Sequence, residues 1–265
     1  MTDTVTNSPA PPVPAATILL VRDGASGLEV FMVKRHHQID FATGALVFPG
    51  GKVSKADFDP ELGAHMDGIA AWSTDMRALA AAAIREAFEE SGILLARDAV
   101  TGEIVGEKRL AMLDAFRQPL ERGEISLREF VSRENLRLAC DRLVRFAHWI
   151  TPAIMPKRFD THFFIAFAPH GHRGHHDGRE SVDSLWISPA DLAADRKTWT
   201  VIFPTRLNLM KLAQSKTGDE ALEAARAAPP LTVEPWVEEG PEGSILRIRD
   251  DAGYTQTWAL MREAI

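Results

Sequence analysis

Three glutamates on one expected helix give this sequence its clearest chemical signal. Residues 85–93 read Arg-Glu-Ala-Phe-Glu-Glu-Ser-Gly-Ile. Helical spacing places Glu86, Glu89 and Glu90 on one face, where like charges repel one another. A divalent cation would reverse that repulsion, and oxygen ligands that leave room for water and a substrate phosphate suit Mg²⁺. The pattern therefore indicates a metal site for phosphate chemistry, with a solvated acidic face and an Arg85–Glu89 ion pair as the alternative.

The helix that carries these glutamates has clear start and stop signals. It is expected to run from about residue 75 to 91, with Ser73, Thr74 or Asp75 as its N-cap. Gly92 follows the last turn, and glycine takes the left-handed conformation that ends a helix at little cost. The alanine-rich start of this helix allows it to pack closely on a sheet.

A glycine pair lies upstream of the helix. Residues 44–48 are expected to form a short strand that ends at Pro49, and Gly50 and Gly51 then allow a tight backbone turn. Residues 54–75, with scattered charges and glycines, are expected to be a partly ordered surface loop. Because the glycine segment closes a strand and the glutamate segment forms a helix, a long connecting loop leaves both intact.

These segments together resemble the Nudix box, G-x5-E-x7-R-E-U-x-E-E-x-G-U, in which U is a bulky apolar residue. The positions that match, with alanine at the first U, are Gly51, Arg85, Glu86, Glu89, Glu90, Gly92 and Ile93. Asp57 replaces the first glutamate of the box, and residues 58–84 replace its seven-residue spacer. The resemblance implies a Nudix hydrolase with an α/β/α sandwich built on a mixed β-sheet.

Diphosphate hydrolysis requires neutralised phosphate charge, a deprotonated water and a stabilised leaving group, and metal ions can supply all of these. The resemblance assigns Glu89 and Glu90 as ligands of Mg²⁺ or Mn²⁺, and it makes Glu86 a further ligand or the base that activates water. The backbone carbonyl of Gly50 is expected to be an additional ligand. Arg85 is expected to orient a glutamate through a charge-assisted hydrogen bond rather than to touch the substrate.

A loop outside the box supplies further candidates. Many Nudix enzymes take another carboxylate from such a loop, and Glu180 or Asp183 fits that position, with an ordinary charged loop as the alternative. The histidines at 170, 172, 175 and 176 lie in the same loop. We expect them to form a solvated polar loop rather than a zinc site, because they lack cysteine partners and a regular helical frame.

The residues before the glycine pair point to a substrate class. Arg35, Gly44 and Phe48 fall in register with a signature of Nudix coenzyme A pyrophosphatases. His36 and Asp40 replace the serine and the second arginine of that signature. The replacement by Asp40 is unfavourable, since a basic residue suits a phosphate and an acidic residue does not.

A closer resemblance is to the acyl-coenzyme A diphosphatases, whose box is also split by an insertion. It rests on residues 149–152 and 156–164 as well as on the box, and it spans roughly residues 16–215. It implies cleavage of CoA or acyl-CoA to 3′,5′-ADP and (acyl-)4′-phosphopantetheine. Gly51 is expected to lie at the substrate, and the candidate phosphate contacts are Lys34, Arg35, Lys157 and Arg158. Alternatively, Lys34 and Arg35 simply end an exposed strand.

Two other functions remain open at this point. The chain could be a Nudix pyrophosphatase for another nucleotide, such as ADP-ribose, NADH or a capped RNA end. It could also be a non-catalytic regulator that binds a nucleotide without cleaving it. The three crowded carboxylates argue against a regulator, because a binding module need not keep them.

Composition limits the setting in which the protein works. The chain has 265 residues, is 45% hydrophobic and carries a formal net charge of −7. It can therefore bury a full core, and its acidic balance argues against an extended nucleic-acid surface. Its single cysteine, the absence of a secretory signal and the absence of a membrane-length apolar run favour a cytoplasmic location. The expected partner is a small-molecule nucleotide, and a homodimer is possible for this fold.

Strand-like and helical segments alternate, which favours an α/β fold with inserted and C-terminal helices. The expected organisation is a flexible tail over 1–14, a hydrolase domain over 15–228 with insertions at 58–75 and about 107–138, and a packed extension over 229–265. The expected strands are 15–22, 28–35, 44–48, 143–151, 159–168 and 182–188, with 93–96 as a further candidate. The other expected helices are 107–121, 126–138, 204–216 and 219–227, with a short one opened by Pro189.

Overall fold

The computed structural model describes residues 9–35, 44–195 and 197–264. The strands of its main sheet are β1 (Val13–Gly24), β2 (Gly27–Arg35), β3 (Leu46–Val47), β4 (Gly50–Lys52), β7 (Val144–Ile150), β8 (Phe159–Phe167), β9 (Ser181–Ile187) and β10 (Thr232–Val233). Their order is β10-β7-β8-β1-β2-β3, with β4 paired to β1 and β9 paired to β2. β1 runs parallel to β8 and β7 runs parallel to β10, whereas the other pairs are antiparallel, so the sheet is mixed.

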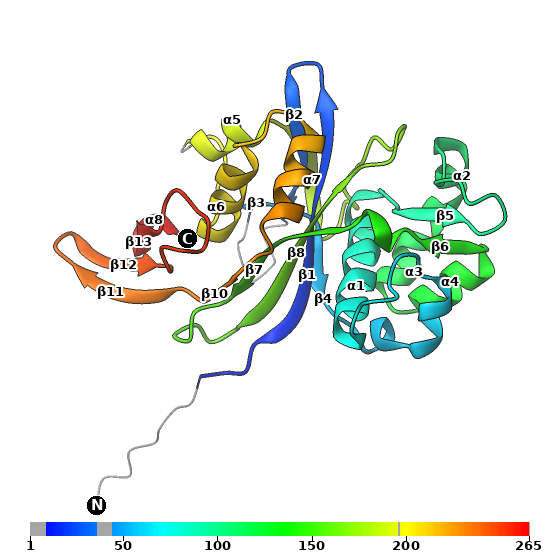
Figure 1. Ribbon diagram of the computed structural model, residues 1–265, viewed down its shortest axis with the longest axis horizontal. Helices are drawn as coiled ribbons and strands as arrows, with labels where there is room; N and C mark the ends of the chain where they lie inside the picture. The colour runs from blue at the N-terminus through cyan, green and yellow to red at the C-terminus, as the bar shows by residue number, and fades with distance from the viewer. Residues whose placement is uncertain (1–8, 36–43, 196, 265) are drawn as a thin grey trace, which may run out of the picture.

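Helices and two small sheets flank this main sheet (Figure 1). The small sheets contain β5 (Ala96–Asp98) with β6 (Leu136–Leu138), and β11 (Trp236–Gly240) with β12 (Gly243–Arg247) and β13 (Trp258–Leu260). The α-helices are α1 (Thr74–Ser91), α2 (Glu107–Leu113), α3 (Arg117–Glu121), α4 (Leu127–Arg133), α5 (Pro189–Ala194), α6 (Phe203–Leu212), α7 (Gly218–Ala227) and α8 (Met261–Ala264). The 3₁₀ helices are η1 (Lys55–Phe58), η2 (Pro60–His65), η3 (Asp114–Phe116) and η4 (Cys140–Arg142).

Each face of the main sheet has its own hydrophobic core, because side chains alternate along a strand. In β1, Ile18 and Leu20 join the core beneath α1, whereas Leu19 and Val21 join the core beneath α5, α6 and α7. Figure 1 shows α1 to α4 on one side of the sheet and α5 to α8 on the other. The expected α/β sandwich with a mixed sheet and added helices is confirmed.

The prediction of a partly ordered surface loop over residues 54–75 understates the order of this segment. Residues 55–58 and 60–65 form η1 and η2. Ser54 caps η1 in a capping box with Asp57, and the Asp59 side chain caps η2 by accepting from the Glu61 N–H. Each short helix therefore has its own start signal, because these side chains satisfy backbone donors that would otherwise lack partners.

The helical insertion also differs from expectation in part. Residues 107–121 and 127–133 are helical, but residues 136–138 form β6 and pair with β5. Leu136 and Leu138 are both buried, which is the alternating pattern of a strand. Phe130 of α4 stacks on Phe88 of α1 with ring centroids 5.5 Å apart, so this segment contributes to the core.

The last part of the chain is joined to the main sheet. β10 pairs with β7, and the Trp149 Nε1–H donates to the Tyr254 hydroxyl, which donates in turn to Asn208 Oδ1. Tyr254 and Asn208 are buried, so these hydrogen bonds hold residues beyond α7 against α6. Within the part of the chain that the structure describes, no helix has both the length and the apolar character needed to span a bilayer.

Candidate active site

Helix α1 places the glutamates because its other face is made of small residues. Its buried alanines lie against the main sheet and let the helix approach closely. Ser73 Oγ accepts from the Met76 N–H at the start of the helix, and Gly92 ends it with φ of 67°. The expected N-cap and C-terminal glycine are both confirmed, and Glu86, Glu89 and Glu90 lie in the last turns of α1.

The glycine pair lies directly against two of these carboxylates. The Gly50 N–H donates to Glu90 Oε2 over 2.9 Å. A Cβ on Gly51 would clash with the Glu86 carboxylate, and one on Gly50 would lie 2.6 Å from the Ala16 carbonyl oxygen. The turn that starts β4 therefore needs two glycines so that the sheet can approach the acidic face of α1.

Arg85 lies at the centre of an ionic network beside the glutamates. Its Nη1 donates to Glu86 Oε1 over 2.8 Å and to Glu89 Oε2 over 3.0 Å. Its Nε and Nη2 donate to both carboxylate oxygens of Asp57 over 3.1 and 3.0 Å. Nη2 also donates to the Lys52 carbonyl oxygen over 3.0 Å. Burial alone would lower the pKa of Arg85, but the surrounding carboxylates outweigh it and raise the pKa, so the guanidinium stays charged.

Asp57 connects the two halves of the split box, because it binds Arg85 from the other side of the insertion. Its side chain is fully buried and bidentate on Arg85, and its carboxylate also accepts from the Ser54 N–H over 2.8 Å. The inserted residues thus fold so that η1 returns to α1 and supplies the carboxylate that holds Arg85. This position, doubtful from the sequence, anchors the arginine that orients Glu86 and Glu89.

The three glutamates lie in an environment that disfavours their charged forms. Burial raises the pKa of Glu89 to about 8, although Arg85 lowers it. Burial and repulsion by Glu86 raise the pKa of Glu90 well above its ordinary value, while the Gly50 N–H opposes this rise. Burial likewise raises the pKa of Glu86 against the pull of Arg85. A cation beside them would favour the ionised carboxylates.

One carboxylate oxygen in this cluster is unsatisfied. Glu89 Oε1 is buried and has no hydrogen-bond partner among the described residues. Buried polar atoms normally have a partner, so an oxygen without one, in a cluster of carboxylates with raised pKa values, fits the role of a ligand to a cation. The donor set is carboxylate oxygen, which suits Mg²⁺ or Mn²⁺.

Two further predicted residues lie near the glutamates. Arg35, at the end of β2, is close enough for its charge to lower the pKa of Glu90. The exposed Glu180, one residue before β9, contributes to the raised pKa values of Glu86 and Glu90 through charge repulsion. β9 pairs with β2, and this pairing brings Glu180 and Arg35 to the same edge of the site. His36 and Asp40 of the substrate signature lie outside the described residues.

Two other predicted substrate contacts are not brought to the glutamates. The Lys34 ammonium lies 5.5 Å from the centre of the Trp199 ring, and Trp199 packs against the core on the opposite face of the sheet from α1. Arg158 is buried and donates to the carbonyl oxygens of Thr151 and Ala10 and to the Glu234 carboxylate. Arg158 therefore joins three chain segments, and it has no place in the substrate site proposed below.

Arg117 is a site residue that the sequence motifs did not indicate. It is buried, and its Nε and Nη2 donate to the Glu89 carbonyl oxygen over 3.1 and 3.0 Å. Its Nη1 lies 2.5 Å from His175 Nε2. Arg117 lies in a segment predicted only as amphipathic helix, and no spacing relative to the box marks it. Beside these residues and Glu89 is a hollow of about 430 Å³.

The histidine loop is tied to the core more firmly than expected. His172 is buried with its Nε2 2.7 Å from the Val105 carbonyl oxygen, and the His175 N–H donates to the Ser91 carbonyl oxygen over 2.8 Å. His176 bonds to Ser184 of β9, whereas His170 is exposed. The prediction of a solvated loop is therefore wrong for His172, which is buried against Val105, and the His175 backbone holds the loop at the end of α1.

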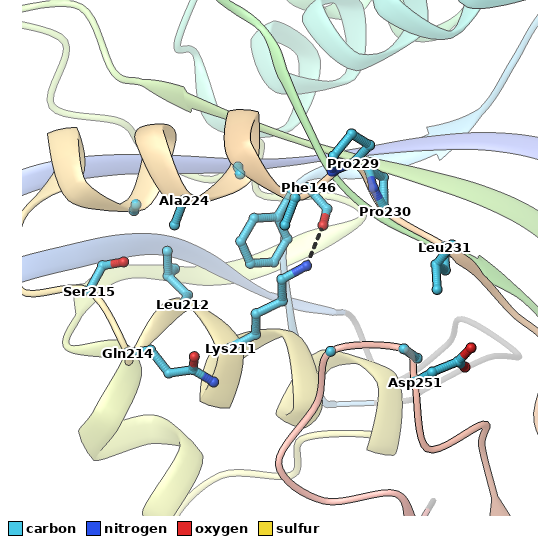
Figure 2. Close-up of a pocket in the computed structure, with 15 residues that line it drawn as sticks. Phe146, Lys211, Leu212, Gln214, Ser215, Ala224, Pro229, Pro230, Leu231 and Asp251 are labelled. Atoms are coloured by element: carbon cyan, nitrogen blue, oxygen red, sulfur yellow. Dashed lines mark hydrogen bonds between the residues drawn. The ribbon is translucent and has the colours of Figure 1, made fainter.

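A second hollow, of about 290 Å³, lies on the other face of the sheet between α6, α7 and residues 229–231 (Figure 2). Lys211 donates from Nζ to the Phe146 carbonyl oxygen over 2.9 Å, and burial lowers the pKa of this lysine. The lining is largely alanine, leucine and proline. Because the main sheet lies between this hollow and α1, we assign it no part in the glutamate site.

Gly51→Ala is expected to lower kcat by about 100-fold, because the added methyl group displaces the Glu86 carboxylate and small misplacements of reacting groups have effects of this size. Steady-state hydrolysis of the substrate proposed below measures this change in kcat. Gly106→Ala is the matched control, since a Cβ there meets no atom within 4 Å and its φ is −84°. An unchanged kcat in Gly51→Ala would contradict the close packing of the glycine turn on Glu86.

Comparison with known proteins identifies the family. Residues 70–208 match the family described as the NUDT19 Nudix domain. The acyl-coenzyme A diphosphatase NUDT19 of Xenopus laevis is 24% identical over 222 residues, which cover 69% of this chain and 58% of that protein. The crystal structure of a Nudix hydrolase from Alicyclobacillus acidocaldarius has a TM-score of 0.72 at 28% identity, and the match covers 83% of this chain and 99% of that chain. The chain is therefore a Nudix hydrolase and belongs to the NUDT19 Nudix domain family.

Proposed function

We propose that this Nudix hydrolase cleaves the diphosphate of CoA or acyl-CoA to 3′,5′-ADP and (acyl-)4′-phosphopantetheine with Mg²⁺ or Mn²⁺. The observation that carries the metal-dependent reaction is the cluster of three buried or half-buried glutamates with an unpaired oxygen on Glu89. The substrate assignment is supported by the register of Arg35, Gly44 and Phe48 and by the similarity to the acyl-coenzyme A diphosphatase of Xenopus laevis.

The residues that would hold the ions are Glu86, Glu89 and Glu90, with the Gly50 carbonyl and Glu180 as further ligands. Bound divalent ions neutralise diphosphate charge, acidify a water and stabilise the leaving phosphate. Arg85 fixes Glu86 and Glu89 through the hydrogen bonds described above, and Asp57 fixes Arg85. Glu86 is either a ligand or the group that takes the proton from water.

Among the predicted substrate cations, we assign the contact with the substrate phosphates to Arg35. Its charge acts on Glu90, so it lies on the side of the sheet where a diphosphate beside the glutamates would need a cation. Gly51 has no side chain to occupy the space next to Glu86, and the hollow beside Glu89 provides room for the rest of a ligand. The cytoplasmic location and the homodimer stay predictions of the sequence.

A substrate panel tests this proposal. We expect CoA and acetyl-CoA to be hydrolysed with a higher kcat/KM than NADH, FAD or ADP-ribose, and mass analysis should show 3′,5′-ADP as the nucleotide product. Each substrate is assayed with Mg²⁺ and with Mn²⁺. A preference for ADP-ribose over every CoA ester would contradict the substrate assignment and leave the hydrolase assignment intact.

The same substrate panel also tests whether hydrolysis requires a divalent metal ion. Removal of divalent ions with a chelator should abolish hydrolysis, and added Mg²⁺ or Mn²⁺ should restore it, because carboxylates gathered this closely favour a hard dication. Turnover that persists unchanged in excess chelator would reject the metal role of the glutamates.

A further inference from the structure

Two histidines and an aspartate meet on neighbouring strands, away from the glutamates. His148 on β7 pairs in register with His162 on β8, and their rings stack with centroids 3.9 Å apart. Asp160 precedes His162 by two residues, so both side chains point to the same face of β8. Asp160 Oδ1 lies 2.5 Å from His148 Nε2 and 3.8 Å from His162 Nε2. The metal-binding atoms of all three residues lie within 4.8 Å of one another.

This trio is separate from the glutamate site, because a strand lies between them. Ala16 of β1 pairs with Gly51 of β4 on one side and with His162 of β8 on the other. Strands lie about 4.8 Å apart, so the backbones of Gly51 and His162 are about 10 Å from each other. Gly51 contacts Glu86, and a single ion cannot be shared across such a distance.

We propose that His148, Asp160 and His162 form a second metal site, which binds one transition-metal dication of the Zn²⁺ class. The ligands are the Nε2 atoms of both histidines and the carboxylate of Asp160. The site is distinct from the Mg²⁺ or Mn²⁺ site of the hydrolase in position and in donor chemistry, and its occupancy does not depend on which diphosphate the enzyme cleaves.

The donor set selects for this class of ion. Imidazole suits Zn²⁺, Cu²⁺, Fe²⁺ and Ni²⁺, whereas the carboxylates on α1 suit Mg²⁺ and Mn²⁺. Ligand atoms at ordinary Zn–N and Zn–O distances in a tetrahedron are about 3.3 Å apart. The separations of 2.5 and 3.8 Å around Asp160 Oδ1 lie on either side of this value. The two imidazole rings stack at an interplanar angle of 22°, so they must rotate apart for both Nε2 atoms to point at one ion. Three protein ligands leave one position for water.

The surroundings of the trio support a built site. The side chains of His148 and His162 are only 14% and 16% exposed, and both stand on paired strands rather than on loops. Thr232 Oγ1 of β10 lies 2.8 Å from His148 Nδ1. Such a bond on the second ring nitrogen fixes the orientation of a metal-binding histidine. An ion bound here would tie together β7 and β8 and, through Thr232, β10.

Direct metal binding tests the proposal. The full chain is stripped with chelator, transferred to buffer with excess Mg²⁺ to occupy the glutamates, and titrated with Zn²⁺ by calorimetry, with metal content measured after gel filtration. We expect one bound Zn²⁺ per wild-type chain and loss of that ion in His162→Ala. Glu90→Gln should retain it, and His170→Ala, which changes an exposed histidine outside the trio, should bind like wild type.

Variants of the trio and of its partner Thr232 distinguish a metal-binding role of the trio from a purely structural one. Thr232→Val should weaken Zn²⁺ binding by about 10–100-fold, the usual effect of losing a partner of a ligand. Zn²⁺ should raise the unfolding temperature of wild type and not that of His162→Ala, and bound Co²⁺ should give visible absorption only when the trio is intact. If His162→Ala does not fold, His148→Asn provides the same comparison. Absence of Zn²⁺ binding by wild type, or equal binding by wild type and the trio variants, overturns the proposal.

Discussion

Replacing Glu90 with glutamine is expected to lower kcat by about 10³-fold or more while the protein keeps its fold. The glutamine oxygen can still accept from the Gly50 N–H, so the packing of β4 on α1 survives the change. The negative charge, however, is lost from the position where a dication would bind. Metal ions contribute several kcal/mol to the stabilisation of transition-state charge, and each 1.4 kcal/mol corresponds to about a tenfold change in rate.

The measurement is single-turnover hydrolysis at saturating Mg²⁺, with circular dichroism and thermal unfolding as tests of the fold. Glu61→Gln is the matched control, because Glu61 is an exposed glutamate of η2 whose carboxylate lies 3.5 Å from Arg128. It should leave kcat unchanged. Wild-type turnover in folded Glu90→Gln would remove the metal role of this residue and with it the proposed mechanism.

Replacing Arg85 with methionine is expected to lower the free energy of unfolding by about 3–5 kcal/mol. The substitution leaves Asp57, whose side chain is fully buried, without the guanidinium that binds both of its oxygens. Removing one partner of a buried ion pair typically lowers the free energy of unfolding by about this amount, because the other partner keeps an uncompensated charge. Glu86 and Glu89 lose a partner in the same step. Urea unfolding at pH 7 in the presence of chelator measures the change without a contribution from bound metal.

Two further variants test whether the loss of stability in Arg85→Met comes from the buried Arg85–Asp57 ion pair. Arg128→Met breaks another arginine–aspartate pair of the inserted segment, with Asp59, but its side chains are 33% and 27% exposed, so the expected loss is below about 1 kcal/mol. The double variant Arg85→Met/Asp57→Asn should lose less than the sum of the two single variants, since it leaves no unpaired aspartate charge. A loss in Arg85→Met no larger than that in Arg128→Met would show that Asp57 does not depend on Arg85.

The parts of the fold that were predictable from sequence carry local signals. Ser73 and Gly92 mark the ends of α1 because a capping side chain and a left-handed glycine act within one helical turn. The hairpin of β1 and β2 is similarly marked by the glycines between two apolar runs. The glutamate spacing is readable because a helix has a fixed period, so three carboxylates could be assigned to one face before any tertiary structure was known.

The parts that were not predictable depend on contacts between distant segments. η1 and η2 are held in place by Asp57 on Arg85 and by the Asp59–Arg128 ion pair, and neither contact is visible in a segment of charged residues. Arg117 and His175 meet beside Glu89 although one lies in a helix and the other in a loop. β6 is different, because the alternation of Leu136 and Leu138 is present in the sequence, but three residues are too few to distinguish a strand from a helix by their periodicity.

The parallel pairing of β1 with β8 has a consequence for how the protein is made. Residues 13–21 of β1 find their partners in residues 159–167. At synthesis rates of roughly 5–20 residues per second, the first strand waits on the order of 10 s for its neighbour to leave the ribosome. During that interval the backbone N–H and C=O groups along that edge of β1 lack their β8 hydrogen-bond partners. Nascent chains of this protein are therefore expected to need chaperone protection until the second strand emerges.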